Sequence, residues 1–216
     1  MRAAIPGARG LSLARAAMKL VLASANPGKQ REFAALLAPQ GIELLLQSAL
    51  GIESIEETGN TFVENALLKA RHAAERSGLA ALADDSGLEV DALGGAPGVR
   101  SARFAGEGAS DAANNALLLE RLSGVPAPLR GARYRCVLAL VRNAGDPAPL
   151  LAEGHWEGRI ARAPQGSGGF GYDPLFLPEN RPGTAAQLSA EDKNSISHRG
   201  RALQALLSAL PDVLAH

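Results

Sequence analysis

The sequence predicts an α/β fold in which strands and helices alternate along one globular unit, with room for two lobes. Short apolar runs typical of buried strands are followed by segments with helical apolar spacing, and 46% of the 216 residues are hydrophobic. A chain of this length buries roughly 70% of its unfolded surface, which suffices for a core. With 24 glycines and 13 prolines, the chain is rich in turns without reaching the range of low-complexity sequences.

Charge and cysteine content narrow the class of protein. The 22 basic residues balance 22 acidic ones, so the chain lacks the positive field typical of proteins that bind nucleic acid or acidic membranes. Any bound anion must therefore be held locally. The single cysteine, Cys136, cannot form an internal disulfide and is expected in the core. Since no apolar run approaches the roughly 20 residues that span a bilayer, we expect a soluble cytoplasmic protein with neither a nucleic-acid nor a membrane partner.

The N-terminal segment differs from the rest of the chain. Residues 1–17 contain three arginines and no acidic residue, and the chain turns abruptly apolar after Met18. A transit-like leader has this charge. We favour the simpler interpretation that residues 1–17 are a poorly ordered extension, followed by a single bilobed domain over 18–216.

The first expected unit is a strand over 20–23, a loop over 24–29 and a helix whose Phe33, Leu36 and Leu37 share one face. A glycine-containing turn between a strand and a helix directs backbone N–H groups and a partial positive charge at one point. Lys29 adds a full charge there. The loop therefore suits an anion such as phosphate, although Asn-Pro-Gly also forms ordinary turns.

A second helix is indicated by Thr61 as the N-cap, with Glu64 completing a capping box and Gly78 ending the helix. Its apolar stripe is formed by Phe62, Ala66, Ala70 and Ala73, and its opposite face carries Glu64, Lys69, His72 and Arg76. Glu56 and Glu57 precede it. Magnesium normally uses only one or two protein carboxylates, so one of these could serve a metal site. Alternatively, both simply interact with the helix dipole.

An acidic pair lies between two expected strands, one over 79–83 and one over 88–92. Asp84 and Asp85 would then follow a strand end. Adjacent carboxylates repel each other and are costly to bury unless a cation or a hydrogen-bond donor compensates them. Because side chains alternate, one carboxylate can serve structure while the other points into a cleft. An Asx-type turn with a solvated Asp85 is the alternative.

The middle of the chain predicts a loop over 93–98, a short helix over 111–122 with Leu118 and Leu122 inward, and a β-hairpin. The hairpin pairs a strand over 134–141 with one over 150–156, because the first is rich in β-branched and apolar residues and a Gly-Asp-Pro turn follows it.

Four glycines lie among the ten residues 165–174. Glycines allow the backbone to approach a flat ligand closely, while Phe170 or Tyr172 could stack on a base and Asp173 could bond its edge. A mobile surface turn is the alternative, but two aromatic residues in a chain with only 4% aromatics argue against it.

The C-terminal part predicts a polar segment over 188–197 and a helix over 196–210. The leucines expected to be buried on this helix are Leu203, Leu206, Leu207 and Leu210. Lys193, His198 and Arg199 gather around the start of the helix, where the dipole attracts an anion. His198 could act as a general base, but capping or binding an edge is the commoner role of such a histidine.

Six ordered motifs between about residues 19 and 210 resemble the inosine triphosphate pyrophosphatase family. They are Ser24 to Lys29, Glu56 to Gly59 with Phe62 and Glu64 to Ala66, Ala83 to Leu88, Leu93 to Val99, Gly168 to Pro174, and Ser197 to Arg199. The resemblance implies a two-lobed fold with a long mixed β-sheet flanked by helices, a central nucleotide cleft, and a homodimer. It also implies hydrolysis of non-standard purine nucleoside triphosphates (ITP, dITP, XTP) to the monophosphate and pyrophosphate.

The same resemblance implies roles for particular residues. Asp85 is the catalytic base and, with Glu57, binds Mg²⁺; Glu56 is the alternative second ligand. The triphosphate is held by Ser24, Ala25, Asn26, Pro27, Gly28, Lys29 and Lys69. Further substrate contacts, mostly to the base, come from Ser86, Phe170, Gly171, Tyr172, Asp173, Lys193, His198 and Arg199. An inactive nucleotide-binding module on the same scaffold is the competing hypothesis, but a binder of a polyanion has no use for carboxylates facing phosphates.

Overall fold

The structure is a computed structural model that describes residues 18–214. Its strands are β1 (Met18–Leu22), β2 (Ile42–Leu46), β3 (Ala81–Val90), β4 (Gly131–Val141), β5 (Leu150–Ile160) and β6 (Phe176–Pro178). Its helices are α1 (Pro27–Leu37), α2 (Phe62–Ser77), α3 (Asp111–Arg121), α4 (Ala190–Ile196) and α5 (His198–Leu214), with short 3-10 turns between them. The expected N-terminal extension, residues 1–17, lies outside the described residues.

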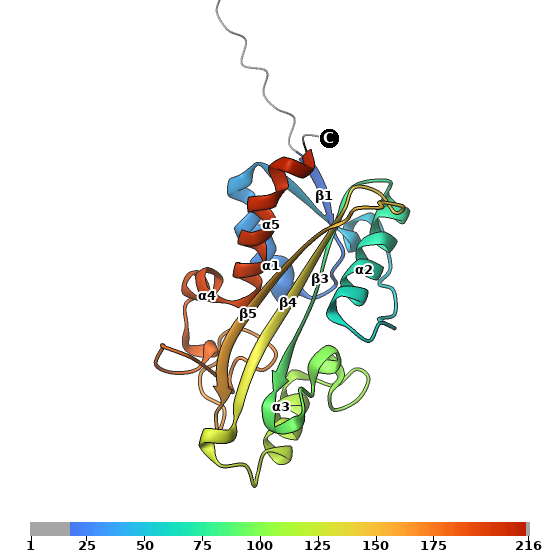
Figure 1. The fold of residues 1–216 in the computed structure, drawn as a ribbon. Coiled ribbons are helices and arrows are strands. Elements are labelled where there is room, and N and C mark those ends of the chain that lie inside the picture. The colour runs from blue at the N-terminus through green and yellow to red at the C-terminus, as the bar shows by residue number, and fades with distance from the viewer. Residues whose placement is uncertain (1–17, 215–216) are drawn as a thin grey trace, which may run out of the picture.

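The strands form one mixed sheet in the order β2-β1-β3-β4-β5-β6. β1 is parallel to both β2 and β3, whereas β3 to β6 pair antiparallel. The predicted hairpin is confirmed: β4 and β5 pair from Gly131 opposite Arg159 to Leu140 opposite Leu150. Both strands are longer than the sequence pattern indicated, and with β3 they extend through the whole molecule (Figure 1).

The acidic pair does not lie at a strand end, and this prediction was wrong. Residues 81–90 form one continuous strand, and Asp84 and Asp85 lie in its middle, paired with Leu138 and Val137 of β4. Ser-Gly at 86–87 does not interrupt the strand. Gly87 is instead required by packing, because a Cβ there would overlap the carbonyl oxygen of Gly98.

Helices cover both faces of the sheet (Figure 1). α1 and α5 pack against one face, where Phe33, Leu82 and Leu203 belong to one apolar cluster. The alanine stripe of α2 packs against the other face, as predicted. A third cluster surrounds α3 and the far ends of β3 to β5; it includes Leu118 and Leu122. We call this third region the lower lobe, and it explains why the molecule has two lobes on one sheet.

Local signals fixed the start of the second helix correctly and the C-terminal helices less well. Thr61 and Glu64 form the predicted capping box, and Gly78 ends α2 in a left-handed conformation. The polar segment 188–197 contains an extra helix, α4, and α5 begins at His198 rather than at 196. Ser189 caps α4 by accepting a hydrogen bond from the N–H of Asp192, so the sequence does carry a start signal for this helix. Leu207 is only half-buried.

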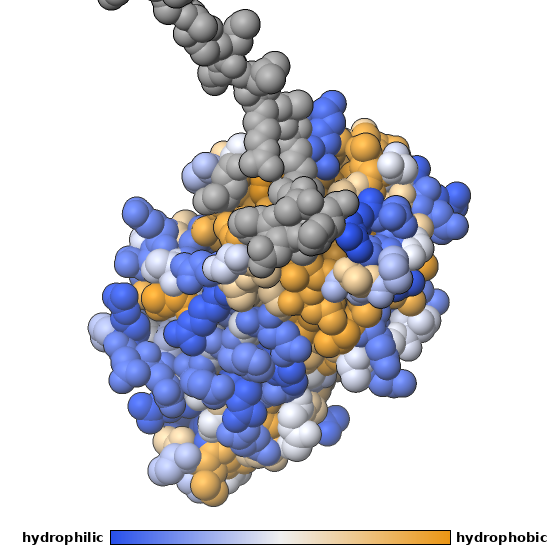
Figure 2. All heavy atoms as spheres, turned by 45° about the horizontal axis from the view of Figure 1, so that its top comes forward, coloured by the Kyte–Doolittle hydropathy of each residue, from blue (hydrophilic) through white to orange (hydrophobic). Residues whose placement is uncertain are grey.

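The face shown in Figure 2 mixes hydrophilic regions with several apolar patches, of which the broadest lies near the middle of the view. Within residues 18–214, no helix combines the length and apolar character needed to cross a membrane. Cys136 lies in the core beneath the helix α5, as predicted, and burial raises the pKa of its thiol to about 12.

We expect Gly154→Ala to destabilise the protein by about 1–3 kcal/mol through overpacking. A Cβ at this position on β5 would overlap the carbonyl oxygen of His198 and press on the N–H of Ala202, because α5 packs directly on the strand backbone. Gly145→Ala is the matched control, since its Cβ would meet nothing closer than 3.7 Å. Denaturant unfolding checks the difference, and equal unfolding free energies for the two variants would contradict it.

Candidate active site

A cleft of about 430 Å³ opens at the middle of the sheet, between the two lobes. Its lining comes from many parts of the chain: the loop before α1, the segment between β2 and α2, α2 itself, β3, the segment 101–114 that leads into α3, β4, the glycine-rich loop, and α4 with the start of α5. Most predicted site residues line it: Ser24, Ala25, Asn26, Lys29, Glu57, Lys69, Ser86, Phe170, Gly171, Tyr172, Asp173, Lys193, His198 and Arg199. Pro27, Gly28 and Asp85 are not among its lining residues.

The loop before α1 is held by its own side chains. The Oδ1 atom of Asn26 accepts hydrogen bonds from the N–H groups of Gly28 (2.8 Å) and Lys29 (3.1 Å), and Ser24 Oγ accepts one from the N–H of Asn26 (3.2 Å). We expected these N–H groups to be free for an anion. They are occupied because Asn26 is the N-cap of the helix. The positive charge at the loop therefore comes from Lys29, together with the helix end.

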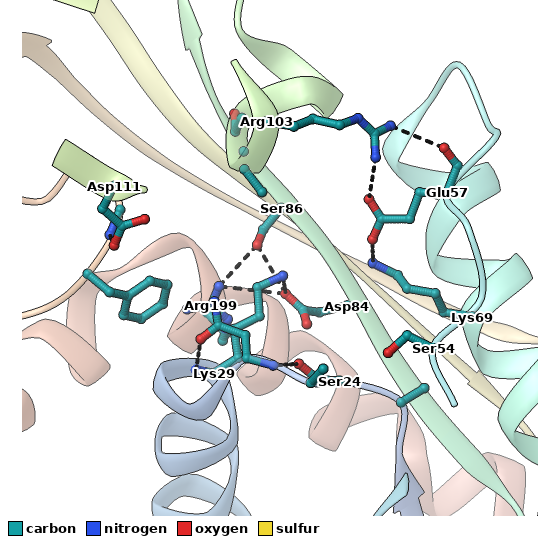
Figure 3. A pocket seen from close by; sticks show the side chains of 18 of the residues that line it. Ser24, Lys29, Ser54, Glu57, Lys69, Asp84, Ser86, Arg103, Asp111 and Arg199 are labelled. Carbon is teal, nitrogen blue, oxygen red and sulfur yellow. Dashed lines mark hydrogen bonds and ion pairs between the residues drawn. The ribbon is translucent and has the colours of Figure 1, made fainter. Parts of the chain in front are cut away.

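Asp84 faces α1 and α5, on the opposite side of the strand from Asp85. Lys29 Nζ lies 2.8 Å from its Oδ2 atom, and Ser86 Oγ donates a hydrogen bond to the same oxygen (3.0 Å; Figure 3). Arg199 approaches it to 3.6 Å. Although burial opposes ionisation, the charges of Lys29 and Arg199 hold the pKa of Asp84 well below its usual range. Asp84 is thus a permanent anion that anchors two cations at the cleft floor.

Asp85 faces α2 and is 4% exposed. Lys69 Nζ lies 3.3 Å from its Oδ1 atom, and the fully buried Asn65 donates a hydrogen bond to its Oδ2 atom (3.1 Å). Burial and the charge of Glu57 raise the pKa of Asp85, while Lys69 opposes the rise. A carboxylate with an elevated pKa is suited to accept a proton.

Glu57 completes an acid–lysine cluster with Asp85 and Lys69. Its Oε1 atom lies 2.6 Å from Lys69 Nζ, so one ammonium bridges two carboxylates. Figure 3 shows Lys69 and Arg103 pointing toward Glu57 from two sides; Arg103 also donates a hydrogen bond to its backbone carbonyl (3.1 Å). Glu56 is exposed on the cleft wall, and it takes part in no ion pair that the structure describes.

This cluster suits a hard cation. Asp85 and Glu57 direct oxygen atoms at one point that a positive charge already occupies. Within the described residues, no three His, Cys, Asp or Glu side chains are grouped to hold a metal ion by themselves. Two carboxylates are nevertheless the usual protein share of a magnesium site whose other positions go to water and substrate phosphates.

The glycine-rich loop forms the opposite end of the cleft. Phe170 is half-buried, and the ammonium of Lys193 lies 4.6 Å from its ring centroid. Asp173 is buried and accepts hydrogen bonds from Lys193 (2.6 Å) and from the N–H of Phe170 (2.9 Å). Tyr172 is not free to stack on a base: its ring is in the lower-lobe core, and its hydroxyl donates to the carbonyl of Ser101 (2.8 Å).

His198 and Arg199, the first residues of α5, close the same end. Burial and the neighbouring cations hold the pKa of His198 well below the usual range of a histidine, so the imidazole is neutral at pH 7. Its ring stacks on Tyr134, and its Nδ1 atom is buried without a hydrogen-bond partner among residues 18–214. Arg199 is 2% exposed, paired with Glu32 and bonded to Ser86 Oγ (3.0 Å), and its Nε likewise has no partner within the described part of the chain. Such buried groups at a cleft can bond a polar ligand.

A sequence model of the Ham1 family matches residues 20–209, nearly the whole described chain. The chain belongs to the Ham1 family. The resemblance predicted from the six motifs is thereby confirmed, and so is the mixed α/β fold.

Ham1 relatives align over almost their full length. A dITP/XTP pyrophosphatase of Methylococcus capsulatus is 60% identical over 192 residues, covering 89% of this chain and 96% of that protein. A dITP/XTP pyrophosphatase of Yersinia pseudotuberculosis is 57% identical over 194 residues, with 90% and 98% covered. Among solved structures, a HAM1 protein from Coxiella burnetii superposes with a TM-score of 0.83 at 50% identity, covering 90% of this chain and 99% of that chain.

Sequence reasoning missed three residues of the Ham1 cleft. Glu32 on α1 bridges Lys193 (3.1 Å) and Arg199, which are more than 160 positions away in the chain. Arg103 pairs with Glu57 across 46 positions. Asn65 belongs to the motif Glu64 to Ala66, and the sequence alone indicates no role for it. A signal for two of them was available in the sequence. Glu32 and Asn65 each directly precede an apolar residue of a helix stripe, which places their polar side chains beside the buried face of the helix.

Proposed function

We propose that this chain hydrolyses ITP, dITP and XTP to the nucleoside monophosphate and pyrophosphate, which removes damaged purines from the nucleotide pool. The observation that carries the proposal is that the two ends of one cleft differ chemically. An acid–lysine cluster (Asp85, Glu57, Lys69) lies at one end, and buried polar groups without partners lie at the other. The names of the Ham1 relatives support the same reaction.

The lysines of the cleft change partners when the substrate binds. Lys29 forms an ion pair with one carboxylate (2.8 Å) and Lys69 with two (2.6 and 3.3 Å), and a polyphosphate offers both lysines a more highly charged partner. Movement of Lys69 onto a phosphate uncovers Asp85. Its elevated pKa then lets it orient and deprotonate the water that attacks the α-phosphorus, while the lysines neutralise the leaving pyrophosphate.

We propose that Asp85 and Glu57 hold Mg²⁺ in this reaction, with Glu56 as the alternative to Glu57. When bound, the ion supplies charge stabilisation for the phosphate oxygens and the leaving group. The shared bridge to Lys69 supports Glu57, because it places that carboxylate beside Asp85.

Base selection follows from the polar end of the cleft. Neutral His198, the free Nε of Arg199 and the Lys193–Asp173 pair offer fixed donors and acceptors for the 6-keto group and N1–H that hypoxanthine and xanthine share. Adenine would leave these buried groups unpaired, which is costly. Guanine differs from hypoxanthine only at position 2 and is harder to reject. Phe170, rather than Tyr172, would supply the stacking surface.

We also propose that the protein acts in the cytoplasm as a homodimer. The family resemblance implies the dimer, and the broadest apolar patch in Figure 2 supports an interaction surface on that face. Light scattering after size-exclusion chromatography tests this proposal; a monomer mass at micromolar concentration would contradict it.

We expect the purified protein to release pyrophosphate, not orthophosphate, from ITP and XTP in the presence of Mg²⁺. At one concentration, the rates for ITP, XTP and GTP should all exceed the rate for ATP, since only adenine lacks the 6-keto group. EDTA should stop the reaction and excess Mg²⁺ should restore it. Stepwise release of orthophosphate, or equal rates with ATP and ITP, would contradict the proposal.

A further inference from the structure

Helix α3 of the lower lobe holds the glycine-rich loop by both backbone groups of one residue. The N–H of Gly171 donates to Asp111 Oδ2 (2.7 Å), and its carbonyl accepts from Asn115 Nδ2 (2.8 Å). Gly171 has φ +62°, a conformation that a side chain would strain. The two side chains, four residues apart on α3, therefore fix the peptide on each side of Gly171.

One of the two α3 side chains, Asn115, is itself held in place, whereas Asp111 is exposed. Asn115 is 9% exposed, and its Nδ2 also donates to the carbonyl of Asp111 (2.7 Å). The preceding residue, Asn114, bonds the backbone at 102 and 105, which ties α3 to the neighbouring wall of the cleft. Figure 3 shows Asp111 on the side of the cleft opposite Glu57 and Lys69. We call Asp111 and Asn115 the α3 clamp. The clamp thus contacts the base end of the cleft and does not contact the phosphate end.

The loop that is clamped carries the residues that face the base. Phe170 precedes Gly171 directly, and its N–H is bonded to Asp173, which in turn holds Lys193. A shift at Gly171 would therefore move the ring and the carboxylate together, away from cations that are fixed from α1 by Glu32.

From this geometry we infer that Asp111 and Asn115 are positioning residues for base recognition. The inference rests on the proposed function, since it assigns a task within that same cleft. It predicts an effect confined to binding of the nucleoside. Inorganic tripolyphosphate has no base, so its affinity should not depend on Asp111 or Asn115.

The test compares Asp111→Ala and Asn115→Ala with Glu120→Ala, which removes an exposed carboxylate from the same helix. Loss of a hydrogen bond of ordinary to moderate strength corresponds to a rise in KM for ITP of about 5- to 30-fold. The inhibition constant of tripolyphosphate and the kcat for ITP should stay close to wild type. Asp111→Asn, which keeps an acceptor oxygen, should restore most of the lost affinity.

Hydrogen exchange separates this inference from the proposed function. The amide of Gly171 should exchange faster in Asp111→Ala than in Glu120→Ala, whether or not the protein hydrolyses any nucleotide. Unchanged exchange, an unchanged KM, or tripolyphosphate inhibition that weakens in step with KM would overturn the clamp. A wild-type protein that releases no pyrophosphate would overturn only the proposed function. If Asp111→Ala fails to fold, Asp111→Asn and Asn115→Ala carry the same comparison.

Discussion

Replacement of Asp85 by Asn is expected to lower pyrophosphate release from ITP by about 10²–10⁴-fold, the range attributed to a positioned general base. The amide keeps the size of the carboxylate and can still meet Asn65, which lies 3.1 Å away. It cannot accept a proton, and it removes one of the two carboxylates at the proposed Mg²⁺ position. Because the pKa of Asp85 is already raised by burial, the neutral side chain should be tolerated by the fold.

Initial rates of pyrophosphate release and thermal unfolding, measured on the same preparation, check this expectation. Asp91→Asn is the matched control: it makes the same change just beyond the end of β3, at an exposed residue that pairs with Arg133 and does not line the cleft. Substantial activity in Asp85→Asn, with an intact fold, would remove Asp85 from the mechanism.

The motifs predicted which residues meet in the cleft better than they predicted the backbone that carries them. Local signals sufficed where the cause is local, as in the capping box of Thr61 and the alternation that separates Asp84 from Asp85. They failed at Gly87. This position requires a glycine because the carbonyl oxygen of Gly98, a residue outside the strand, leaves no room for a side chain. A glycine needed for close packing looks the same in a sequence as a glycine needed for a turn.

Which charged residues pair with one another could not be predicted, for a related reason. Phosphate binding was expected of Lys29 and Lys69, and in the structure each is neutralised by a carboxylate of β3. Glu32 was missed because its partners are more than 160 residues distant. Ion pairs between far segments depend on how the sheet brings helices together, which no spacing along the chain reveals.

Replacement of Lys69 by Met is expected to lower kcat/KM for ITP by about 10²–10³-fold, the cost of losing one donor to developing negative charge. It should also move the acidic limb of the pH–rate profile to higher pH. Lys69 is the main influence that lowers the pKa of Asp85, against burial and the charge of Glu57, which raise it. Without the ammonium the pKa of Asp85 rises further, so a less acidic medium is needed to ionise the base.

The pH profile of kcat/KM distinguishes this electrostatic effect from simple damage to α2. Although burial opposes the charge, Asp85, Asp84 and Glu57 raise the pKa of Lys69, so the wild-type ammonium persists through neutral pH. Lys69→Arg keeps a cation beside both carboxylates and should leave the acidic limb near its wild-type position. Arg76→Met, at an exposed position in the last turn of the same helix, should change neither rate nor profile. A Lys69→Met enzyme that is slower at every pH by the same factor would show that Lys69 does not set the ionisation of Asp85, and the lysine would then act on the substrate phosphates alone.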